Sequence, residues 1–351
     1  MKRVLGIFRG FPGLGRVVAG VSLLETLRDQ YGYEVKMISY LQGKEYLISR
    51  GYQIPCEASP LDYCSIGLLP TNKMGVNIHN TIKEFIPNII VIDGEPLILH
   101  SIKISFPKIK IITLLNPADV ENKKNDKESM EYFNALYSLS DLAIVHGLRR
   151  LDNDVRYKRM VSTRTILRNE ILQIKNAPTN NIYCILGGGT VNVDNQFEIS
   201  TLKIAKLCRE ATQYLAKYNM HIICSSKNIY NALKEGCRDT KNLMLYDRII
   251  PAREYYEDAC LIITRSGRNT LSELAYLGIP AISFISGGVY REVEQSNNIE
   301  DIGIPCIHKA NVNMSTEDFV NLCHNLIGTR VKTESTIGNM DAIKEVLKLC
   351  E

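Results

Sequence analysis

The 351-residue sequence predicts two α/β domains, each with a parallel sheet covered by helices. Two observations support this prediction. Short apolar runs rich in β-branched residues alternate with helical patterns along nearly the whole chain, which is typical of buried parallel strands. A strand that runs into a glycine-rich turn begins each half of the chain, so the same arrangement occurs twice. A chain of this length can supply each of two domains with its own core.

The first domain is expected over residues 1–160. Its apolar runs predict strands at residues 4–8, 34–40, 88–93, 110–115 and 141–146. Helical patterns lie between these strands, at residues 17–29, around 44–49 and around 129–137. Strands that alternate with helices in this way indicate a parallel, Rossmann-like sheet.

The second domain is expected over residues 161–351, with the polar stretch IKNAPTNN before its first strand. Its pattern predicts strands at residues 181–186, 220–225, 242–246, 260–264 and 281–285, and helices at 201–218 and 316–327. A last helix, near residues 341–349, follows a polar segment and is a candidate to pack back on the first domain.

The composition excludes several classes of protein. Hydrophobic residues make up 45% of the chain and charged residues 23%, as in globular proteins, and a net charge of +4 is too small to indicate a nucleic-acid binder. No run approaches the length of a membrane span, and Arg9 and Pro12 interrupt the apolar start where a signal peptide needs an unbroken core. We therefore expect a cytoplasmic protein.

The cysteines and histidines predict neither disulfides nor a metal site. The ten cysteines are scattered singly without a CxxC pair, and the six histidines form no HExxH or similar spacing. Reduced thiols are the expected state.

Glycine-rich loops follow the first strand of each half. GFPGLGR places Gly13 and Gly15 before the first helix, and LGGGT places Gly188, Gly189 and Thr190 at the corresponding point of the second half. Glycines at such turns let the backbone approach a ligand closely or adopt positive φ. The first loop does not follow the GxGxxG spacing, so ligand contact and a tight turn both remain open.

The stretch TRSGRNTLSELAYLGIPAI, residues 264–282, is the strongest candidate site. A β-branched run precedes it and another ends it, and Gly278 with Pro280 is a usual helix stop, so the stretch is a strand, a helix and a strand. The first helical turn would offer N–H groups and the hydroxyls of Ser266 and Thr270 to a phosphate.

An acid follows one turn further along this helix. Asn269 and Glu273 lie opposite the apolar face, so Glu273 is expected to face solvent or a cleft. There its carboxylate could accept hydrogen bonds from both hydroxyls of a ribose. In the alternative interpretation, Ser266 is an ordinary N-cap, and Arg268 and Glu273 are solvated charges.

The run RSGRNTLSELAYLGIPAISF, followed by EVEQSNNIEDIG, resembles the nucleotide-sugar socket of GT-B glycosyltransferases, most closely the peptidoglycan N-acetylglucosaminyltransferase family and its relatives. The residues at the matching positions are Arg265, Ser266, Gly267, Thr270, Ser272, Glu273, Gln295 and Asn298. The resemblance implies two Rossmann-like domains facing each other across a cleft, and a UDP-sugar bound through its diphosphate and ribose.

Looser similarities nominate further residues of the donor site. ILRNE resembles the family's linker that supplies an arginine to the diphosphate, which nominates Arg168. LGGGT is similar to the second phosphate loop, and Ile249 falls where the family's main chain reads uracil. Arg268 would add charge beside the diphosphate.

The resemblance implies a metal-independent, inverting transfer of a hexose or N-acetylhexosamine to a hydroxyl acceptor. Relatives often carry a histidine at the end of the first loop, whereas this chain has Arg16, which can neutralise charge but cannot accept a proton at neutral pH. Asp93 and Glu95 of IDGEP end a strand and are expected to point toward the cleft, as candidates for the base. Alternatively, one of them caps the next element. His146 is a weaker candidate, because a core histidine is the more common outcome.

The partner of the transferase is less defined. Residues 149–168 contain seven basic residues and two acids, which could bind an anionic acceptor or a membrane surface that carries a lipid-linked one. A solvated basic face is the alternative. The expected acceptor is thus a sugar, a lipid-linked sugar or a small molecule, with peripheral attachment at the inner face of the membrane as a variant of the cytoplasmic location.

Two other functions remain open at this point. A nucleotide-sugar epimerase or hydrolase could use the same frame, with water or the sugar itself in place of the acceptor. A non-catalytic relative could bind nucleotide or partner another transferase, and the missing histidine of the first loop is the feature that favours it.

Overall fold

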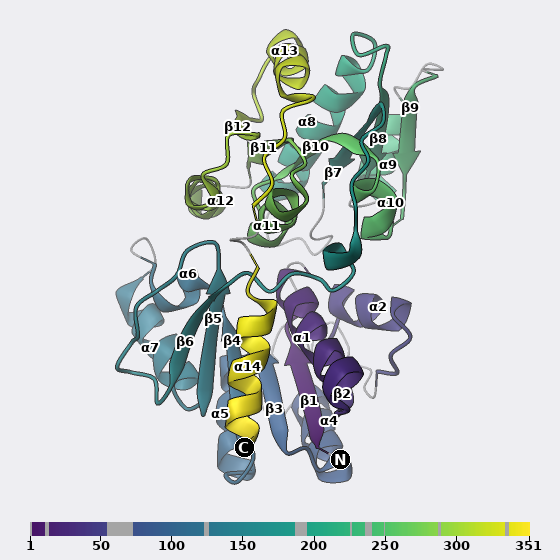
Figure 1. The fold of residues 1–351 in the computed structure, drawn as a ribbon. Coiled ribbons are helices and arrows are strands. Elements are labelled where there is room, and N and C mark those ends of the chain that lie inside the picture. Colours follow the sequence, from purple (N-terminus) through teal and green to yellow (C-terminus); the bar gives the residue numbers. More distant parts are fainter. Residues whose placement is uncertain are drawn as a thin grey trace. The chain divides into compact units, whose positions relative to one another are not determined.

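The computed structural model describes residues 2–10, 14–54, 73–122, 126–186, 195–224, 227–235, 241–248, 250–286, 289–333 and 337–351. The chain forms two compact units, one made of Met1–Arg168 with Ile337–Glu351 and the other of Asn169–Thr336. Each unit contains a six-stranded parallel sheet with helices around it (Figure 1), which confirms the predicted α/β fold class.

The first unit has the strand order β2-β1-β3-β4-β5-β6. Its strands are β1 (Arg3–Phe8), β2 (Glu34–Ile38), β3 (Ile89–Asp93), β4 (Lys110–Leu115), β5 (Leu142–Gly147) and β6 (Met160–Arg164). Its helices are α1 (Gly15–Tyr31), α2 (Gln42–Ser49), α4 (Lys73–Phe85), α5 (Pro96–Ser105), α6 (Pro117–Val120), α7 (Lys127–Tyr137) and α14 (Asn339–Cys350). The central strands are apolar throughout because helices cover both faces of the sheet.

The second unit has the strand order β12-β11-β10-β7-β8-β9. Its strands are β7 (Asn181–Ile185), β8 (Asn219–Ile223), β9 (Leu243–Tyr246), β10 (Ala259–Arg265), β11 (Ala281–Ile285) and β12 (Ile307–Asn311). Its helices are α8 (Asn195–Ala211), α9 (Lys227–Lys234), α10 (Ala252–Tyr256), α11 (Arg268–Leu277), α12 (Val289–Ile302) and α13 (Thr316–Leu326), with the 3-10 turn η1 (Ile171–Gln173).

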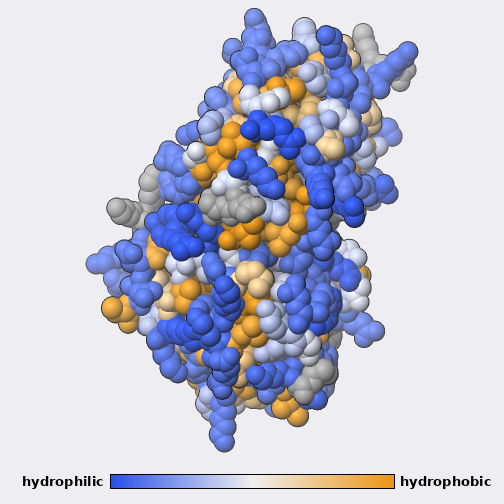
Figure 2. Space-filling view, viewed as in Figure 1, coloured by the Kyte–Doolittle hydropathy of each residue, from blue (hydrophilic) through white to orange (hydrophobic). Residues whose placement is uncertain are grey.

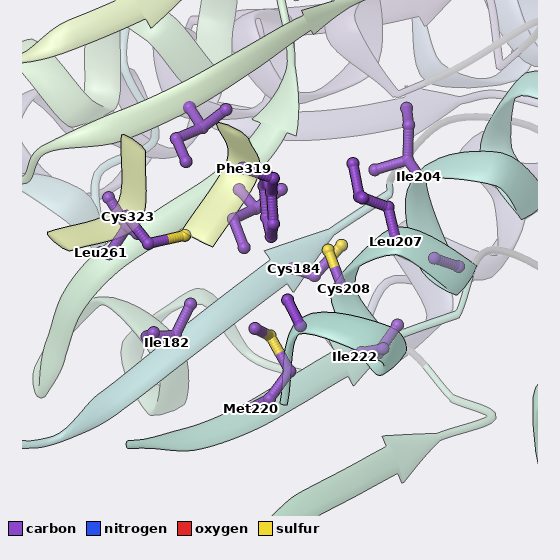
Figure 3. Close-up of a cluster of buried hydrophobic side chains, with 14 of the residues drawn as sticks. Ile182, Cys184, Ile204, Leu207, Cys208, Met220, Ile222, Leu261, Phe319 and Cys323 are labelled. Carbon is purple, nitrogen blue, oxygen red and sulfur yellow. The ribbon is translucent and has the colours of Figure 1, made fainter. Parts of the chain in front are cut away.

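The core of the second unit lies between β7, β8, β10 and the helices α8 and α13. Figure 3 shows Cys184, Cys208 and Cys323 in it among leucine, isoleucine and phenylalanine side chains. Burial raises the pKa of the Cys323 thiol to about 12, so this thiol stays protonated and packs as a small apolar group. The described cysteines are free thiols.

The C-terminal helix α14 packs on α1 and β6 of the first unit. Its start is fixed by main-chain contacts: the Gly338 N–H donates to the Thr165 carbonyl at 2.8 Å, and a Cβ at Gly338 would lie 1.8 Å from the Arg164 carbonyl oxygen. The buried Asn339 side chain accepts from the Leu167 N–H and donates to the Leu167 carbonyl, both at 2.8 Å. The segment by which the chain returns to the first unit, at Gly338 and Asn339, is therefore hydrogen-bonded to the segment by which it leaves, at Thr165 and Leu167.

Several elements differ from the sequence-based expectation. The boundary expected after residue 160 falls at the start of β6, which pairs with β5 and so extends the first unit to Arg168. The helix expected at residues 201–218 runs from Asn195 to Ala211 instead. It stops early because the Asn242 side-chain amide satisfies the carbonyls of Thr212, Leu215 and Tyr218, which form turns.

Hydrophilic residues cover most of the face seen in Figure 2, with apolar side chains between them. In the described part of the chain, no helix combines the length and the apolar character that crossing a membrane requires.

Candidate functional site

Helix α11 of the second unit begins at the carboxyl end of β10 with its N-terminus open. Gly267 is the N-cap residue, it is exposed, and a Cβ at this position would meet no atom within 4 Å. The helix ends at Gly278, which has a left-handed φ of 68° and bonds back to Ala275 and Leu274. A helix of this length with space before its first turn can bind an anion through its N–H groups and dipole.

Ser266 plays a different part from the one expected. It does not cap the helix, and its hydroxyl is buried, 2.7 Å from the Ser283 hydroxyl and donating to the Phe284 carbonyl at 3.2 Å. The hydroxyl bonds to β11 because the pairing of β10 with β11 brings this strand alongside. The side chain thus stabilises the turn that precedes α11.

Gln295 and Asn298 of α12 hold the same loops. The Asn298 amide donates to the Ser266 carbonyl at 3.0 Å, and the Gln295 amide bonds to both the N–H and the carbonyl of Ser286, at 2.7 and 2.9 Å. These two side chains fix the main chain after β10 and after β11, so they hold the loops around the start of α11 in place.

Of the two expected surroundings of Glu273, solvent or a cleft, the structure excludes open solvent. Its exposed fraction is 3%, and its Oε2 accepts a hydrogen bond of 3.0 Å from the Tyr256 hydroxyl. Tyr256 ends α10, so this neighbouring helix supplies a partner to the side of α11 that the helical pattern left polar. A buried carboxylate requires such partners.

The first turn of α11 is half-buried at Arg268, Asn269 and Thr270. The Arg268 Nε donates to the Asn269 Oδ1 at 3.1 Å. Arg265, the last residue of β10, is buried beneath this turn with 8% of its surface exposed. The structure thus brings Arg265, Ser266, Gly267, Arg268, Asn269, Thr270, Glu273, Gln295 and Asn298 together around the start of α11.

Five of the predicted residues, Gly13, Gly188, Gly189, Thr190 and Ile249, lie outside the described residues. Of the other predicted donor-site residues, Gly15 is the exposed first residue of α1, and Arg168 is half-buried at the end of the first unit.

A cluster of ion pairs occupies the carboxyl edge of the first sheet. β1 and β3 lie side by side with Phe8 opposite Asp93, so the residues after both strands meet. The Arg16 Nη1 is 2.7 Å from the Asp93 Oδ1, and its Nη2 is 2.8 Å from the Asp119 Oδ1. Gly94 has a φ of +83°, and a Cβ there would lie 2.5 Å from the Arg16 Cδ, so the turn needs a glycine.

Glu95 is the second buried acid of this edge. Its Oε1 accepts from the Arg9 Nε at 3.3 Å and from the Tyr40 hydroxyl. Asp93 and Glu95, the two candidates for the base, both have an exposed fraction of 0%. They are tolerated in the interior because Arg9 and Arg16 neutralise them.

The electrostatics of this cluster keep its arginines charged. Burial by itself lowers the pKa of Arg16, but the Asp119 and Asp93 carboxylates outweigh it and raise that pKa well above its usual value. Burial and the Glu95 charge raise the pKa of Tyr40, so its phenol remains a neutral donor. Arg16 therefore cannot serve as a base, and the neutral Tyr40 phenol donates to Glu95.

His146 and the basic stretch have local partners. His146 is fully buried on β5, and its Nδ1 accepts from the Ile166 N–H at 3.3 Å, as a core histidine does. Ion pairs hold five of the basic residues of 149–168 to carboxylates of the first unit, namely Arg149–Glu121, Arg150–Asp341, Arg156–Asp154, Lys158–Asp141 and Arg159–Glu345. Local acids thus neutralise much of the charge that suggested an anionic partner.

Sequence reasoning missed the two tyrosines of these sites. Tyr40 and Tyr256 each donate a hydroxyl hydrogen to a buried glutamate, across 55 and 17 positions of the chain. Neither tyrosine lies in a motif, so no local signal could have identified it. In the described ranges, no three histidine, cysteine, aspartate or glutamate side chains come together as a metal-binding group.

Comparison with known proteins gives a family match for part of the chain. Residues 186–304 match the glycosyltransferase family 28 C-terminal domain, and this range contains α11 and α12. No curated protein sequence matches the chain significantly.

Solved structures resemble the whole chain. UDP-GlcNAc 2-epimerase from Neisseria meningitidis is 14% identical with a TM-score of 0.66, and 99% of each chain is covered. The glycosyltransferase SnogD from Streptomyces nogalater is 16% identical with a TM-score of 0.62, and 100% of each chain is covered. MurG from Acinetobacter baumannii is 14% identical with a TM-score of 0.57, covering 99% of this chain and 100% of that chain. With two parallel α/β units, the chain has the GT-B fold of these glycosyltransferases.

Proposed function

We propose that this protein is a glycosyltransferase similar to the peptidoglycan N-acetylglucosaminyltransferase family, which moves a hexose or N-acetylhexosamine from a UDP-sugar to a hydroxyl acceptor. The observation that carries the proposal is the open N-terminus of α11 at the exposed Gly267, within the segment that matches the family 28 domain. A helix N-terminus with this access suits the diphosphate of a nucleotide sugar.

The donor would bind through several groups of the second unit. The first turn of α11, with Thr270 and Arg268, would take the diphosphate, and Glu273 would take the ribose hydroxyls. Gly188, Gly189 and Thr190 would supply a second phosphate loop, and the main chain at Ile249 would contact the uracil. Gly13, Gly15 and Arg168 stay candidates for further contacts with the diphosphate.

The transfer breaks the bond between the anomeric carbon and the diphosphate oxygen and forms a bond from that carbon to the acceptor oxygen. The acceptor's proton must pass to a base. We take Glu95 as the candidate base: Arg9 and Tyr40 hold its Oε1, and its Oε2 has no hydrogen-bond partner among the described residues. Arg16 and Asp93 would then fix the turn through their ion pair. The helix dipole and arginines would stabilise the leaving diphosphate without a metal, with inversion at the anomeric carbon.

Calorimetric binding of UDP, TDP, GDP and CDP to the purified chain tests the donor. We expect selective binding of UDP, weakened by about 1 to 3 kcal/mol in Glu273→Ala, because a charge-assisted contact with the ribose is lost. Glu254→Ala is the matched control, since Glu254 is an exposed acid on the adjacent helix α10 and should leave the affinity unchanged. Absence of binding to all four nucleotides would reject the donor assignment.

A nucleotide-sugar epimerase or hydrolase is the second candidate. The complete burial of Asp93 and Glu95 favours it, because small reactants such as water reach a buried carboxylate more easily than a bulky acceptor does. Incubation of a UDP-sugar without acceptor, followed by NMR of the sugar, separates the two functions. An inverted C2 centre or free sugar formed at a full turnover rate would indicate this second function, and an unchanged donor would indicate a transferase.

A further inference from the structure

We infer that Tyr256 is a positioning residue of the nucleotide site, whose hydroxyl holds Glu273 in the orientation that receives the ribose and so sets a preference for ribose over 2′-deoxyribose. The inference rests on the proposed UDP-sugar function and adds to it a residue outside the motif.

The contact itself is direct. The Tyr256 hydroxyl donates to the Glu273 Oε2 at 3.0 Å, and the exposed fractions of the two residues are 1% and 3%. A carboxylate has about four acceptor positions on its two oxygens, and the phenol occupies one of them. Tyr256 contacts the carboxylate and would not contact the nucleotide.

Tyr256 is itself held in place. Its ring packs edge-to-face on the Tyr255 ring with centroids 4.5 Å apart. Its main-chain carbonyl accepts from the Asn176 side-chain amide at 2.7 Å, and the same amide donates to the Ala259 carbonyl at 3.0 Å. The ring and the main chain of Tyr256 are therefore both held in place, and the phenol can serve as a rigid support.

A fixed support matters because a glutamate side chain has several rotatable bonds. Ordering such a side chain at the moment of binding costs affinity, whereas a carboxylate already held in its binding rotamer avoids that cost. The benefit is confined to ligands that bond to the carboxylate at both ribose hydroxyls. A 2′-deoxyribose offers one hydroxyl fewer and gains less from the same arrangement.

The variant Tyr256→Phe keeps the ring and removes only the hydroxyl. We expect its affinity for UDP to fall about fivefold to tenfold, and its affinity for 2′-deoxy-UDP to change less than twofold, so that the preference for ribose shrinks. Calorimetry with both nucleotides on the full chain measures this ratio. Tyr183→Phe is the control, because the buried Tyr183 hydroxyl donates to the Glu254 main chain and should leave the ratio unchanged.

A second variant keeps the test decisive if Tyr256→Phe does not fold. Glu273→Asp retains the charge but withdraws the carboxylate from the phenol by one methylene, and it should lose the ribose preference in the same way. A ribose preference equal to that of the unaltered chain, in either folded variant, overturns the inference while UDP binding still supports the proposed function. Failure of the unaltered chain to bind UDP overturns both.

Discussion

The carboxyl edges of the two sheets each bury a glutamate against a tyrosine hydroxyl, yet they stabilise it in different surroundings. In the first unit, Glu95 bonds to Tyr40 within a cluster of charged side chains that includes Arg9 and Arg16. In the second unit, Glu273 bonds to Tyr256 beside a turn that is held by neutral hydroxyl and amide groups. The first edge balances its own charges, whereas the second holds a helix N-terminus ready for the charge of a ligand.

The largest effect should come from removing the ion pairs of Arg16 at the carboxyl edge of the first sheet. Arg16→Ala leaves the carboxylates of Asp93 and Asp119 without this guanidinium, which should lower the free energy of unfolding by about 3 to 5 kcal/mol. Urea unfolding of the full chain measures the loss, and hydrogen exchange of peptides from β1 and β3 assigns it to the first unit.

The control for Arg16 is an ion pair at the surface. Arg3 and Glu34 are paired at 3.0 Å, but their side chains are 42% and 41% exposed. Arg3→Ala should therefore cost less than about 1 kcal/mol. Similar losses of unfolding free energy in Arg16→Ala and Arg3→Ala would show that burial does not make the Arg16 ion pairs stronger than an ion pair at the surface.

The carboxyl edge of the second sheet, where neutral groups hold the turn, should lose less stability on substitution. Ser266→Ala removes the hydroxyl partner of Ser283 and should cost about 1 to 3 kcal/mol, because a buried hydroxyl loses a partner. Added salt should not alter this loss, since no charge is involved. Ser49→Ala, at an exposed hydroxyl, provides the baseline of about 0.5 kcal/mol or less. A loss for Ser266→Ala as large as that for Arg16→Ala would contradict the ranking of the two edges.

The smallest effect concerns pH in the second unit. Burial lowers the pKa of His221, partly opposed by the Asp258 charge, and its Nδ1 lies 2.9 Å from the Tyr246 hydroxyl. In the unfolded chain the His221 imidazole is protonated near pH 6.5, whereas the folded unit disfavours its protonation. The contribution of neutral His221 to the free energy of unfolding is therefore present above pH 6.5 and is lost as the pH falls below it.

His221→Gln should therefore flatten the pH dependence of unfolding in this range, as followed by hydrogen exchange of β8 peptides. His308→Gln, at an exposed position on β12, should leave the slope as it is. An unchanged slope in His221→Gln would mean that other groups of the unit cause the acid sensitivity.

The sequence predicted most of the fold because the central strands are continuous apolar runs. β4 and β11 agree with their expected ranges, and α11 stops at Gly278 as its sequence indicated. One edge strand of each sheet was missed, since β6 and β12 contain polar residues and depend on pairing with distant strands. The end of α8 was missed because Asn242, far along the chain, satisfies the carbonyls there.

The same limit applies to the site. The end of a predicted strand nominated Glu95, and helical periodicity nominated Glu273. Neither pattern could show that the acid is buried, because Tyr40 and Tyr256 come from other elements. The Ser266 hydroxyl looked available because its partner on β11 becomes a neighbour only once β10 and β11 pair. Motifs locate a site along the chain, and the contacts that set its chemistry are made by folding.

The bonds of Gly338 and Asn339 to residues 165 and 167 have a topological consequence. The chain leaves the first unit after Arg168 and returns to it at Ile337, and its two crossings are joined by hydrogen bonds within that unit. The second unit is therefore a domain inserted into the first, and the two chain segments that connect it are hydrogen-bonded to each other. Such a domain can be exchanged between Arg168 and Ile337 without breaking the sheet of the first unit, which offers a way to join other inserted domains to the same first unit.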